Sequence, residues 1–158
     1  MRRIVLLLSA MALVLCLGAG VALAYGDVGR GVTKTCGTHC EGTTFPDTLK
    51  GTSNENHIEG LGGNESATFG DLIQGFGNND TLSGDRGGDR IEGGSAADSI
   101  FGGLGEDLLI GGKGRDHIDG GSGGDKIEVK DGYRDIVNCE GGNDNVRNRD
   151  RIDILHNC

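Results

Sequence analysis

Seven aspartates recur along the middle of the chain at an unbroken spacing of nine residues. They are Asp71, Asp80, Asp89, Asp98, Asp107, Asp116 and Asp125. Carboxylate oxygens suit Ca²⁺ because this hard cation takes roughly 6 to 8 oxygens in a flexible arrangement, whereas Mg²⁺ demands a tighter octahedron. The spacing therefore predicts a regular series of calcium-binding sites.

Each of these aspartates is followed two residues later by a large aliphatic side chain. The aliphatic residues are Ile73, Leu82, Ile91, Ile100, Leu109, Ile118 and Ile127. The unit is typical of a turn and a very short strand, because glycines in 111–116 permit positive φ and His117, Ile118 and Asp119 then alternate polar, apolar and polar. A helix is excluded, since glycine recurs too densely and one apolar residue in nine gives no continuous stripe.

Weaker copies of the unit extend the pattern in both directions. The upstream copies contain Asp47, Asn56 and Glu65, and the downstream copies contain Asp135, Asp144 and Asp153. Only six residues separate Glu65 from Asp71, which predicts a longer turn there. Asp135 follows Asp125 by ten residues, so one extra residue is expected in that turn as well.

Two units would form one coil of eighteen residues, because a single unit cannot bury its one inward side chain alone. One column of aspartates would then contain Asp71, Asp89, Asp107 and Asp125, and the other Asp80, Asp98 and Asp116. Coils stacked ~4.8 Å apart bring the carboxylates of a column close together. They would repel each other by ~3 kcal/mol at an intermediate dielectric, which favours a cation between successive turns. The predicted fold is two thin parallel sheets that face each other.

These units resemble the RTX, or haemolysin-type calcium-binding, nonapeptide repeat family, whose pattern is G-G-x-G-x-D-x-U-x with U a large aliphatic residue. The closest matches are GGLGEDLLI from Gly102, GGKGRDHID from Gly111 and GGSGGDKIE from Gly120. The resemblance implies an all-β fold, a right-handed parallel β-roll (a β-solenoid), in which backbone carbonyls of the turns join the aspartates as metal ligands. The implied carbonyl ligands belong to Gly102, Leu104, Glu106, Gly111, Lys113, Arg115, Gly120, Ser122 and Gly124. Three gaps in the first column and two in the second predict about five Ca²⁺ ions.

Two central units depart from the family pattern at its last glycine. Asn78 and Ala96 stand there, and alanine tolerates the left-handed conformation poorly, so the turn at Ala96 is expected to be strained or its site weak. A metal-free solenoid, whose aspartates only cap turns, is the structural alternative. Capping alone would let Asn and Ser alternate with Asp, which does not happen in the seven central units.

The composition excludes several classes of protein. Glycine contributes 32 of 158 residues, proline 1 and aromatic residues 4%, so neither an aromatic-filled core nor a collagen triplet is possible. The formal net charge of −9 becomes about −11 without Arg2 and Arg3. An acidic surface repels phosphates and anionic lipids, so we expect calcium ions as partners rather than nucleic acid or membrane.

Residues 1–24 are typical of a cleaved signal peptide. Two arginines precede an apolar run over 4–17, and small residues follow at 22–24. A membrane anchor is the alternative, but the run is shorter than the ~20 residues that a spanning helix needs. We therefore expect cleavage near Ala24-Tyr25, secretion to an extracellular location and no membrane insertion of the mature chain.

Four cysteines remain once Cys16 leaves with the signal peptide, and an even number in an exported chain favours disulfides. A zinc site is the alternative, but the paired Cys-x2-Cys spacing is absent. Cys36 and Cys40 are expected to close a small loop. Cys139 and Cys158 are nineteen residues apart, nearly one coil, and are expected to pair at the other end. The expected organisation is a signal peptide (1–24), an N-terminal cap (25–44), calcium-binding repeats (45–137), and degenerate repeats with a C-terminal cap (138–158).

Sequence motifs of catalysis are absent: the chain contains no G-x-S-x-G, no H-E-x-x-H and no P-loop, so no enzymatic activity is expected. An ice-binding solenoid would need a regular array of threonines, whereas outward pairs such as Arg90 and Glu92 are charged. A third possibility is an adhesion, matrix or envelope-interaction module that calcium makes rigid. Its partner would meet a patch such as Phe101, Leu108 and Ile110.

Overall fold

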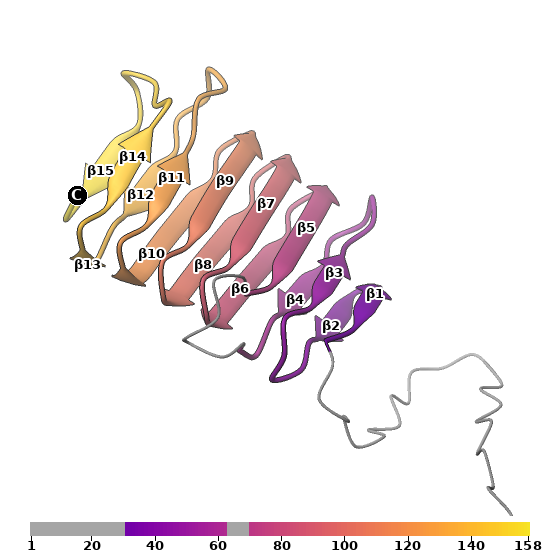
Figure 1. The fold of residues 1–158 in the computed structure, drawn as a ribbon. Coiled ribbons are helices and arrows are strands. Elements are labelled where there is room, and N and C mark those ends of the chain that lie inside the picture. The colour runs from indigo at the N-terminus through magenta and orange to yellow at the C-terminus, as the bar shows by residue number, and fades with distance from the viewer. Residues whose placement is uncertain (1–30, 63–69) are drawn as a thin grey trace, which may run out of the picture.

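The computed structural model describes residues 31–62 and 70–158 (Figure 1). The predicted signal peptide and its cleavage site lie outside the described residues, as does Glu65 of an upstream repeat. The described part of the chain consists of strands and turns. It contains no helix that could cross a membrane.

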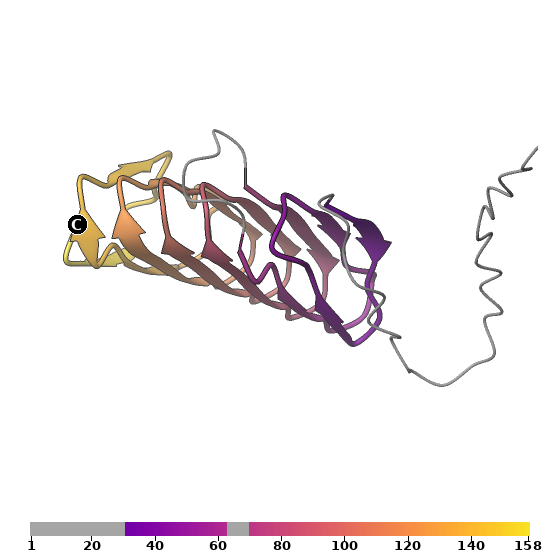
Figure 2. The same ribbon diagram turned by 60° about the horizontal axis from the view of Figure 1, so that its bottom comes forward.

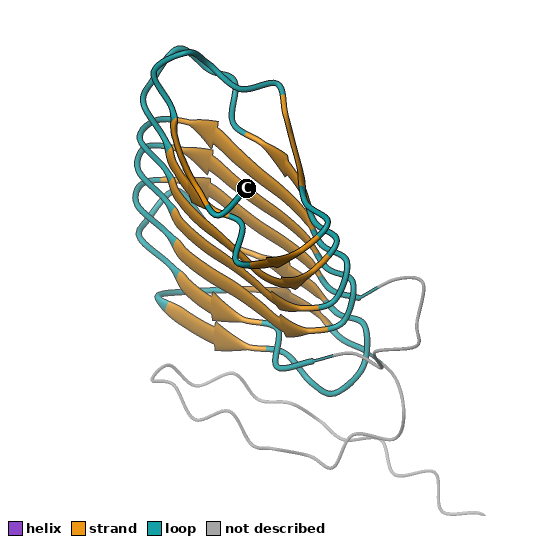
Figure 3. Ribbon diagram, turned by 90° about the vertical axis from the view of Figure 1, so that its left-hand side faces the viewer, coloured by secondary structure: helices purple, strands orange, loops and turns teal. Residues whose placement is uncertain are grey.

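The strands form two parallel sheets that lie face to face (Figures 1 and 3). The first sheet contains, in spatial order, β1 (Thr33–Thr35), β3 (Thr48–Lys50), β5 (Leu72–Gly77), β7 (Arg90–Ser95), β9 (Leu108–Lys113), β11 (Lys126–Glu128) and β14 (Asn145–Arg147). The second contains β2 (His39–Glu41), β4 (His57–Glu59), β6 (Thr81–Arg86), β8 (Ser99–Leu104), β10 (His117–Gly123), β12 (Ile136–Asn138) and β15 (Ile154–His156), with β13 (Gly141–Gly142) beside β10. The chain alternates between the sheets and so winds into a β-solenoid of about six turns, whose coils are stacked in Figure 2. The predicted all-β fold of two parallel sheets is confirmed.

The core is a double ladder of aliphatic side chains between the sheets. In the first sheet Ile73 pairs with Ile91, and Ile91 pairs with Leu109. The predicted coil of eighteen residues is thus the observed register. The ladder residues have no exposed surface and are Leu49, Ile58, Ile73, Leu82, Ile91, Ile100, Leu109, Ile118, Ile127 and Val137. Because side chains alternate along a strand, each short strand contributes this one residue to the core and turns its neighbours outward.

Two places in the stack hold coils longer than eighteen residues, on either side of the regular middle. Leu49 pairs with Ile73, 24 residues further along the chain, so six residues are inserted in this coil. Asn56 and Asp71 are neighbouring turn positions along the chain, and the insertion lies between them. Ile118 pairs with Val137, a separation of 19, which accommodates the extra residue expected before Asp135. The core ladder keeps its register across both insertions, since Leu49 still pairs with Ile73 and Ile118 with Val137.

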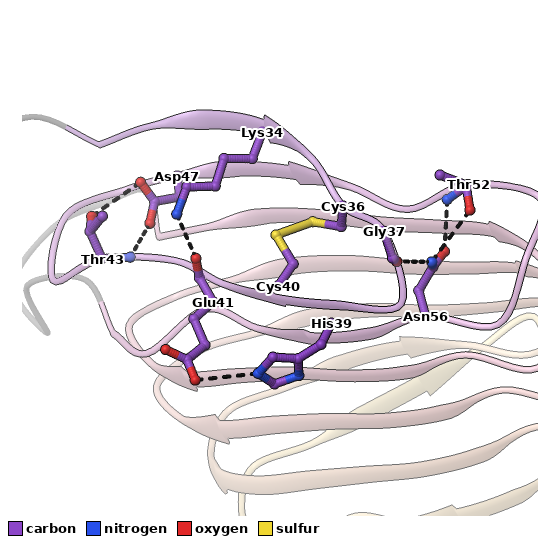
Figure 4. The surroundings of a disulfide bond; sticks show 10 residues. All are labelled: Lys34, Cys36, Gly37, His39, Cys40, Glu41, Thr43, Asp47, Thr52 and Asn56. Atoms are coloured by element: carbon purple, nitrogen blue, oxygen red, sulfur yellow. Dashed lines mark hydrogen bonds and ion pairs between the residues drawn. A yellow bond between two sulfur atoms is a disulfide. The ribbon is translucent and has the colours of Figure 1, made fainter. Parts of the chain in front are cut away.

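Both ends of the solenoid carry a disulfide, with the predicted pairings. Cys36 and Cys40 are joined across the first turn, with 5.3 Å between their Cα atoms (Figure 4). Cys139 and Cys158 join successive coils at the other end, with 5.0 Å between Cα atoms. Cys36 and Cys139 also complete the buried core.

The predicted apolar patch of Phe101, Leu108 and Ile110 does not exist as one surface. Phe101 lies on β8 in the second sheet, whereas Leu108 and Ile110 lie on β9 in the first. All three face away from the core, so they lie on opposite outer faces of the solenoid. The prediction was wrong because residues close in sequence are separated by a turn that changes sheet.

Candidate metal-binding turns

The regular turns combine left-handed backbone with very close approach of neighbouring coils. In the turn from Gly102 to Asp107, Gly103 has φ of 107° and Gly105 has φ of 138°. A Cβ atom on Gly105 would lie 1.9 Å from the carbonyl oxygen of Gly87 in the preceding coil, so no other residue fits there without displacement. Asn78 and Ala96, which replace this glycine in other turns, keep the positive φ at 68° and 92°. The strained turn predicted at Ala96 is therefore present.

The aspartates form the two predicted columns inside the edges of the solenoid. The seven central aspartates and Asp135 are each at most 2% exposed. Their Oδ1 atoms accept a hydrogen bond from the backbone N–H of the residue that ends the turn one coil earlier, which is Asn56 for Asp80 and an aspartate for the others. These bonds run from Asp71 to Asp89 (2.6 Å), Asp89 to Asp107 (2.7 Å), Asp107 to Asp125 (2.9 Å), Asp80 to Asp98 (2.8 Å), Asp98 to Asp116 (3.0 Å) and Asp116 to Asp135 (2.8 Å). One oxygen of each carboxylate thus helps to hold successive coils together.

The second oxygen of each carboxylate has no partner. The Oδ2 atoms of eight buried aspartates lack any hydrogen bond, namely those of Asp71, Asp80, Asp89, Asp98, Asp107, Asp116, Asp125 and Asp135. A buried, unpaired carboxylate oxygen is costly, and such charges are normally paired or bound to a metal. Eight unpaired oxygens at equivalent positions in two columns are too regular to be a packing defect. This regularity indicates that the turns are completed by positive charge.

Burial raises the pKa of these carboxyl groups far above the ordinary value of 3.8. The pKa of Asp89 rises to about 8, mainly through loss of hydration, and the neighbouring carboxylates of Asp107 and Asp71 add to the rise. The pKa is raised to about 7 for Asp71, Asp98, Asp107 and Asp135, to about 6 for Asp116 and Asp125, and is also raised for Asp80. An ionised carboxylate without a neighbouring cation is therefore unfavourable in these columns.

Oxygens from two coils converge beside the first glycine of each turn. A Cβ atom on Gly102 would lie 2.6 Å from Oδ2 of Asp107 and 2.5 Å from the carbonyl oxygen of Gly120, one coil further on. The same pair of oxygen types faces Gly42, Gly75, Gly84 and Gly93, so the convergence is common to the stack, and the free Oδ2 atom distinguishes the central turns. A carboxylate oxygen and a backbone carbonyl oxygen that point at one spot are the donors that Ca²⁺ accepts.

Backbone carbonyls must supply most of the ligands for a cation in these turns. Among the described residues, no three His, Cys, Asp or Glu side chains come together in a way that could hold a metal ion. The carbonyl oxygens of the predicted ligands Gly102, Gly111 and Gly120 face the preceding coil. The carbonyls of Leu104, Lys113 and Ser122 already accept backbone N–H groups at 2.8 Å, which leaves each a second lone pair. Glu106, Arg115 and Gly124 directly precede the aspartates.

Asp135 is buried and hydrogen-bonded like the central aspartates, although the predicted site residues did not include it. It is fully buried, and its Oδ1 accepts the N–H of Asp116 at 2.8 Å. Its ten-residue spacing after Asp125 placed it among the weaker downstream copies, which were not assigned as ligands. The signal that could have found it is Val137, which keeps the aliphatic position two residues later.

Comparison with known protein families places the chain among repeats of this kind. A family model of the RTX calcium-binding nonapeptide repeat, four copies long, matches residues 41–71, 67–91, 74–109, 92–127 and 102–136. These overlapping matches span 41–136, more than half of the 158 residues. No curated protein and no solved structure matches the chain.

Proposed function

Because the chain belongs to the RTX calcium-binding nonapeptide repeat family, we propose that it is a secreted, non-enzymatic protein whose central turns fold around about five Ca²⁺ ions. The main support for the proposal is the set of eight buried Oδ2 atoms, in two columns, that have no hydrogen bonds. Calcium supplies the positive charge that these carboxylates lack. The two disulfides and the acidic composition support an extracellular location, where disulfides persist.

The ions would lie between successive turns of each column. Three gaps separate the four aspartates from Asp71 to Asp125, and two separate those from Asp80 to Asp116. Asp135 would extend the second column by one further gap. In each gap the chain contributes carboxylate oxygens and the first-glycine carbonyl of the turn, while the core ladder fixes the spacing of the coils. We assign this role to residues 45–137, with 25–44 and 138–158 as caps and 1–24 as the signal peptide.

Binding of metal would be coupled to folding. Each repeat buries one aliphatic side chain, and such a thin core gains little free energy against the entropy of ordering its glycine-rich turns. The carboxylates repel each other until a cation separates them. Calcium-free protein should therefore lose much of its β structure in the central coils.

The test is a titration of the disulfide-intact mature protein with Ca²⁺ and Mg²⁺, followed by far-UV circular dichroism. A variant with Asp107→Ala and Asp125→Ala removes two neighbouring carboxylates of one column. Asp119→Ala is the matched control, because Asp119 lies on the outer face of β10. We expect a Ca²⁺-selective gain of β signal in the wild type and the control, and a weaker gain in the double variant.

The metal-free alternative has its own support, since every Oδ1 already bonds a backbone amide. If that were the whole role of the aspartates, the protein would be rich in β structure in chelator and indifferent to Ca²⁺. That result would overturn the proposed function and leave a structural solenoid closed by disulfides.

A further inference from the structure

Two turns at the N-terminal end differ from the central turns at their second position. The turns 42–47 and 51–56 carry Thr43 and Thr52 there, and neither residue has a positive φ. In the six regular turns that end at Asp80 through Asp125, the second residue always has a positive φ. These residues are Phe76 (77°), Asp85 (68°), Gly94 (115°), Gly103 (107°), Gly112 (107°) and Gly121 (87°).

In the N-terminal turns, the chain itself satisfies the side chain that ends the turn (Figure 4). The N–H of Thr43 donates to Oδ2 of Asp47 at 2.5 Å, while the N–H of Val32 donates to Oδ1. The N–H of Thr52 donates to the Oδ1 atom of Asn56 at 2.7 Å. The Nδ2 group of Asn56 donates to the carbonyl of Gly37, so both of its polar ends are bonded. Neither turn leaves a buried oxygen without a partner.

The central turns lack this internal donor. Oδ2 of Asp80 has no hydrogen bond, although Phe76 is placed relative to it as Thr43 is to Asp47, four residues earlier. A change from negative to positive φ at the second residue accompanies a flip of the preceding peptide plane, as between type I and type II turns. The flip removes the N–H from the carboxylate of the same turn, which leaves its Oδ2 atom free to bind a cation. The carbonyl of the first glycine faces the preceding coil, as that of Gly120 faces Gly102.

From this difference we infer that Thr43 and Thr52 make the first two turns calcium-free, and that the peptide orientation at this position decides which turns bind metal. The inference rests on the proposed function and refines it. The family match begins at residue 41 and so includes both turns, yet the ion sites begin at Asp71 and Asp80. The turn that ends at Asp135 has an extra residue and places its positive φ at Gly132 instead, so this rule covers turns of regular length.

A gain-of-function variant tests the inference directly. Thr52→Gly combined with Asn56→Asp gives the second turn both a residue that adopts positive φ and a carboxylate. We expect one more Ca²⁺ per chain than in the wild type, counted by native mass spectrometry of the disulfide-intact protein. Asn56→Asp alone is the matched control and should add no ion, because the N–H of Thr52 still donates a hydrogen bond to the carboxylate at position 56.

A loss-of-function pair keeps the test decisive if the double variant fails to fold. Asp47→Asn should leave the calcium count unchanged, whereas Asp107→Asn should lower it by at least one. Circular dichroism in saturating Ca²⁺ verifies the fold of each variant. A wild type that binds calcium but loses an ion on Asp47→Asn, or a folded double variant without an added ion, overturns this inference alone. A wild type that binds no calcium overturns the proposed function, and this inference with it.

Discussion

The middle of the solenoid and its two ends are built from the same repeat but are held together by different interactions. In the middle, coils of eighteen residues contain no disulfide and carry buried carboxylate oxygens without partners. At the N-terminal end, the backbone amides of Thr43 and Thr52 donate hydrogen bonds to the side chains that end their turns, and a disulfide closes the first coil. At the C-terminal end, Asp150 accepts the N–H of Gly132 at 2.6 Å and Asp153 accepts that of Asp150 at 2.6 Å, beside the second disulfide.

The repeat thus specifies the coil, while a few substituted residues decide whether the polar groups of a coil are satisfied within the chain. Solenoids need ends that expose no unsatisfied core, and the first two turns and the last coil meet that need with bonds inside the chain. The central coils have no such internal bonds for Oδ2. Their stability should depend on solution conditions, whereas that of the ends should depend mainly on sequence.

The largest expected effect is the pH dependence of the calcium-free protein. The folded-state pKa of the column carboxyls, about 6 to 8, lies above the ordinary value of 3.8, so protonation favours the folded state. This stabilisation is fully present below about pH 4 and is lost as the pH rises through 6 to 8. Calcium-free protein should therefore gain β signal by circular dichroism between pH 8 and pH 5.

Hydrogen exchange by peptide locates this gain. Acidification should slow amide exchange most in the central coils and least in residues 31–56, because the N-terminal turns have no unpaired carboxylate oxygen. Equal protection along the whole chain, or a loss of β signal on acidification, would contradict the contrast between the middle and the ends.

The next largest effect concerns the core ladder. Leu109→Ala should lower the free energy of unfolding of the calcium-loaded protein by about 2 to 5 kcal/mol, because Leu109 is fully buried between coils on both sides. Leu155→Ala is the end control, since Leu155 is only partly buried in the last strand, and should cost less than half as much. Denaturant titrations in saturating Ca²⁺ measure both, and equal losses would show that the ends are as tightly packed as the middle.

The smallest expected effect is at Phe76, which occupies the second turn position with a left-handed backbone. A bulky residue there costs about 1 to 2 kcal/mol relative to glycine, and the ring is 50% exposed, so little burial is lost on its removal. Phe76→Gly should stabilise the calcium-loaded protein by about 1 kcal/mol. Phe101→Gly is the control and should destabilise it, because Phe101 has no positive φ. A similar destabilisation by both variants would contradict the role assigned to φ at this position.

Much of the fold could be predicted because it depends on spacing alone. Aspartates nine apart and aliphatic residues two positions later have one arrangement that buries every aliphatic side chain, and the columns, ladder and disulfide pairs follow from it. Irregular spacing limited the prediction. Asp135 was omitted from the site for that reason, and the surface of Phe101 and Leu108 was misassigned because a change of sheet is invisible in local sequence.

By itself, the sequence determined the coil, its core and the positions of the carboxylates, since these follow from periodicity and from the alternation of side chains along a strand. Only the tertiary structure decided which carboxylate oxygens are satisfied. Asp47 and Asp80 occupy the same place in the repeat, yet only Asp47 is met by an amide of its own turn. The orientation of one peptide plane decides whether an N–H faces the carboxylate, and residue type alone does not reveal that orientation, because Phe76 and Asp85 adopt positive φ as the glycines do.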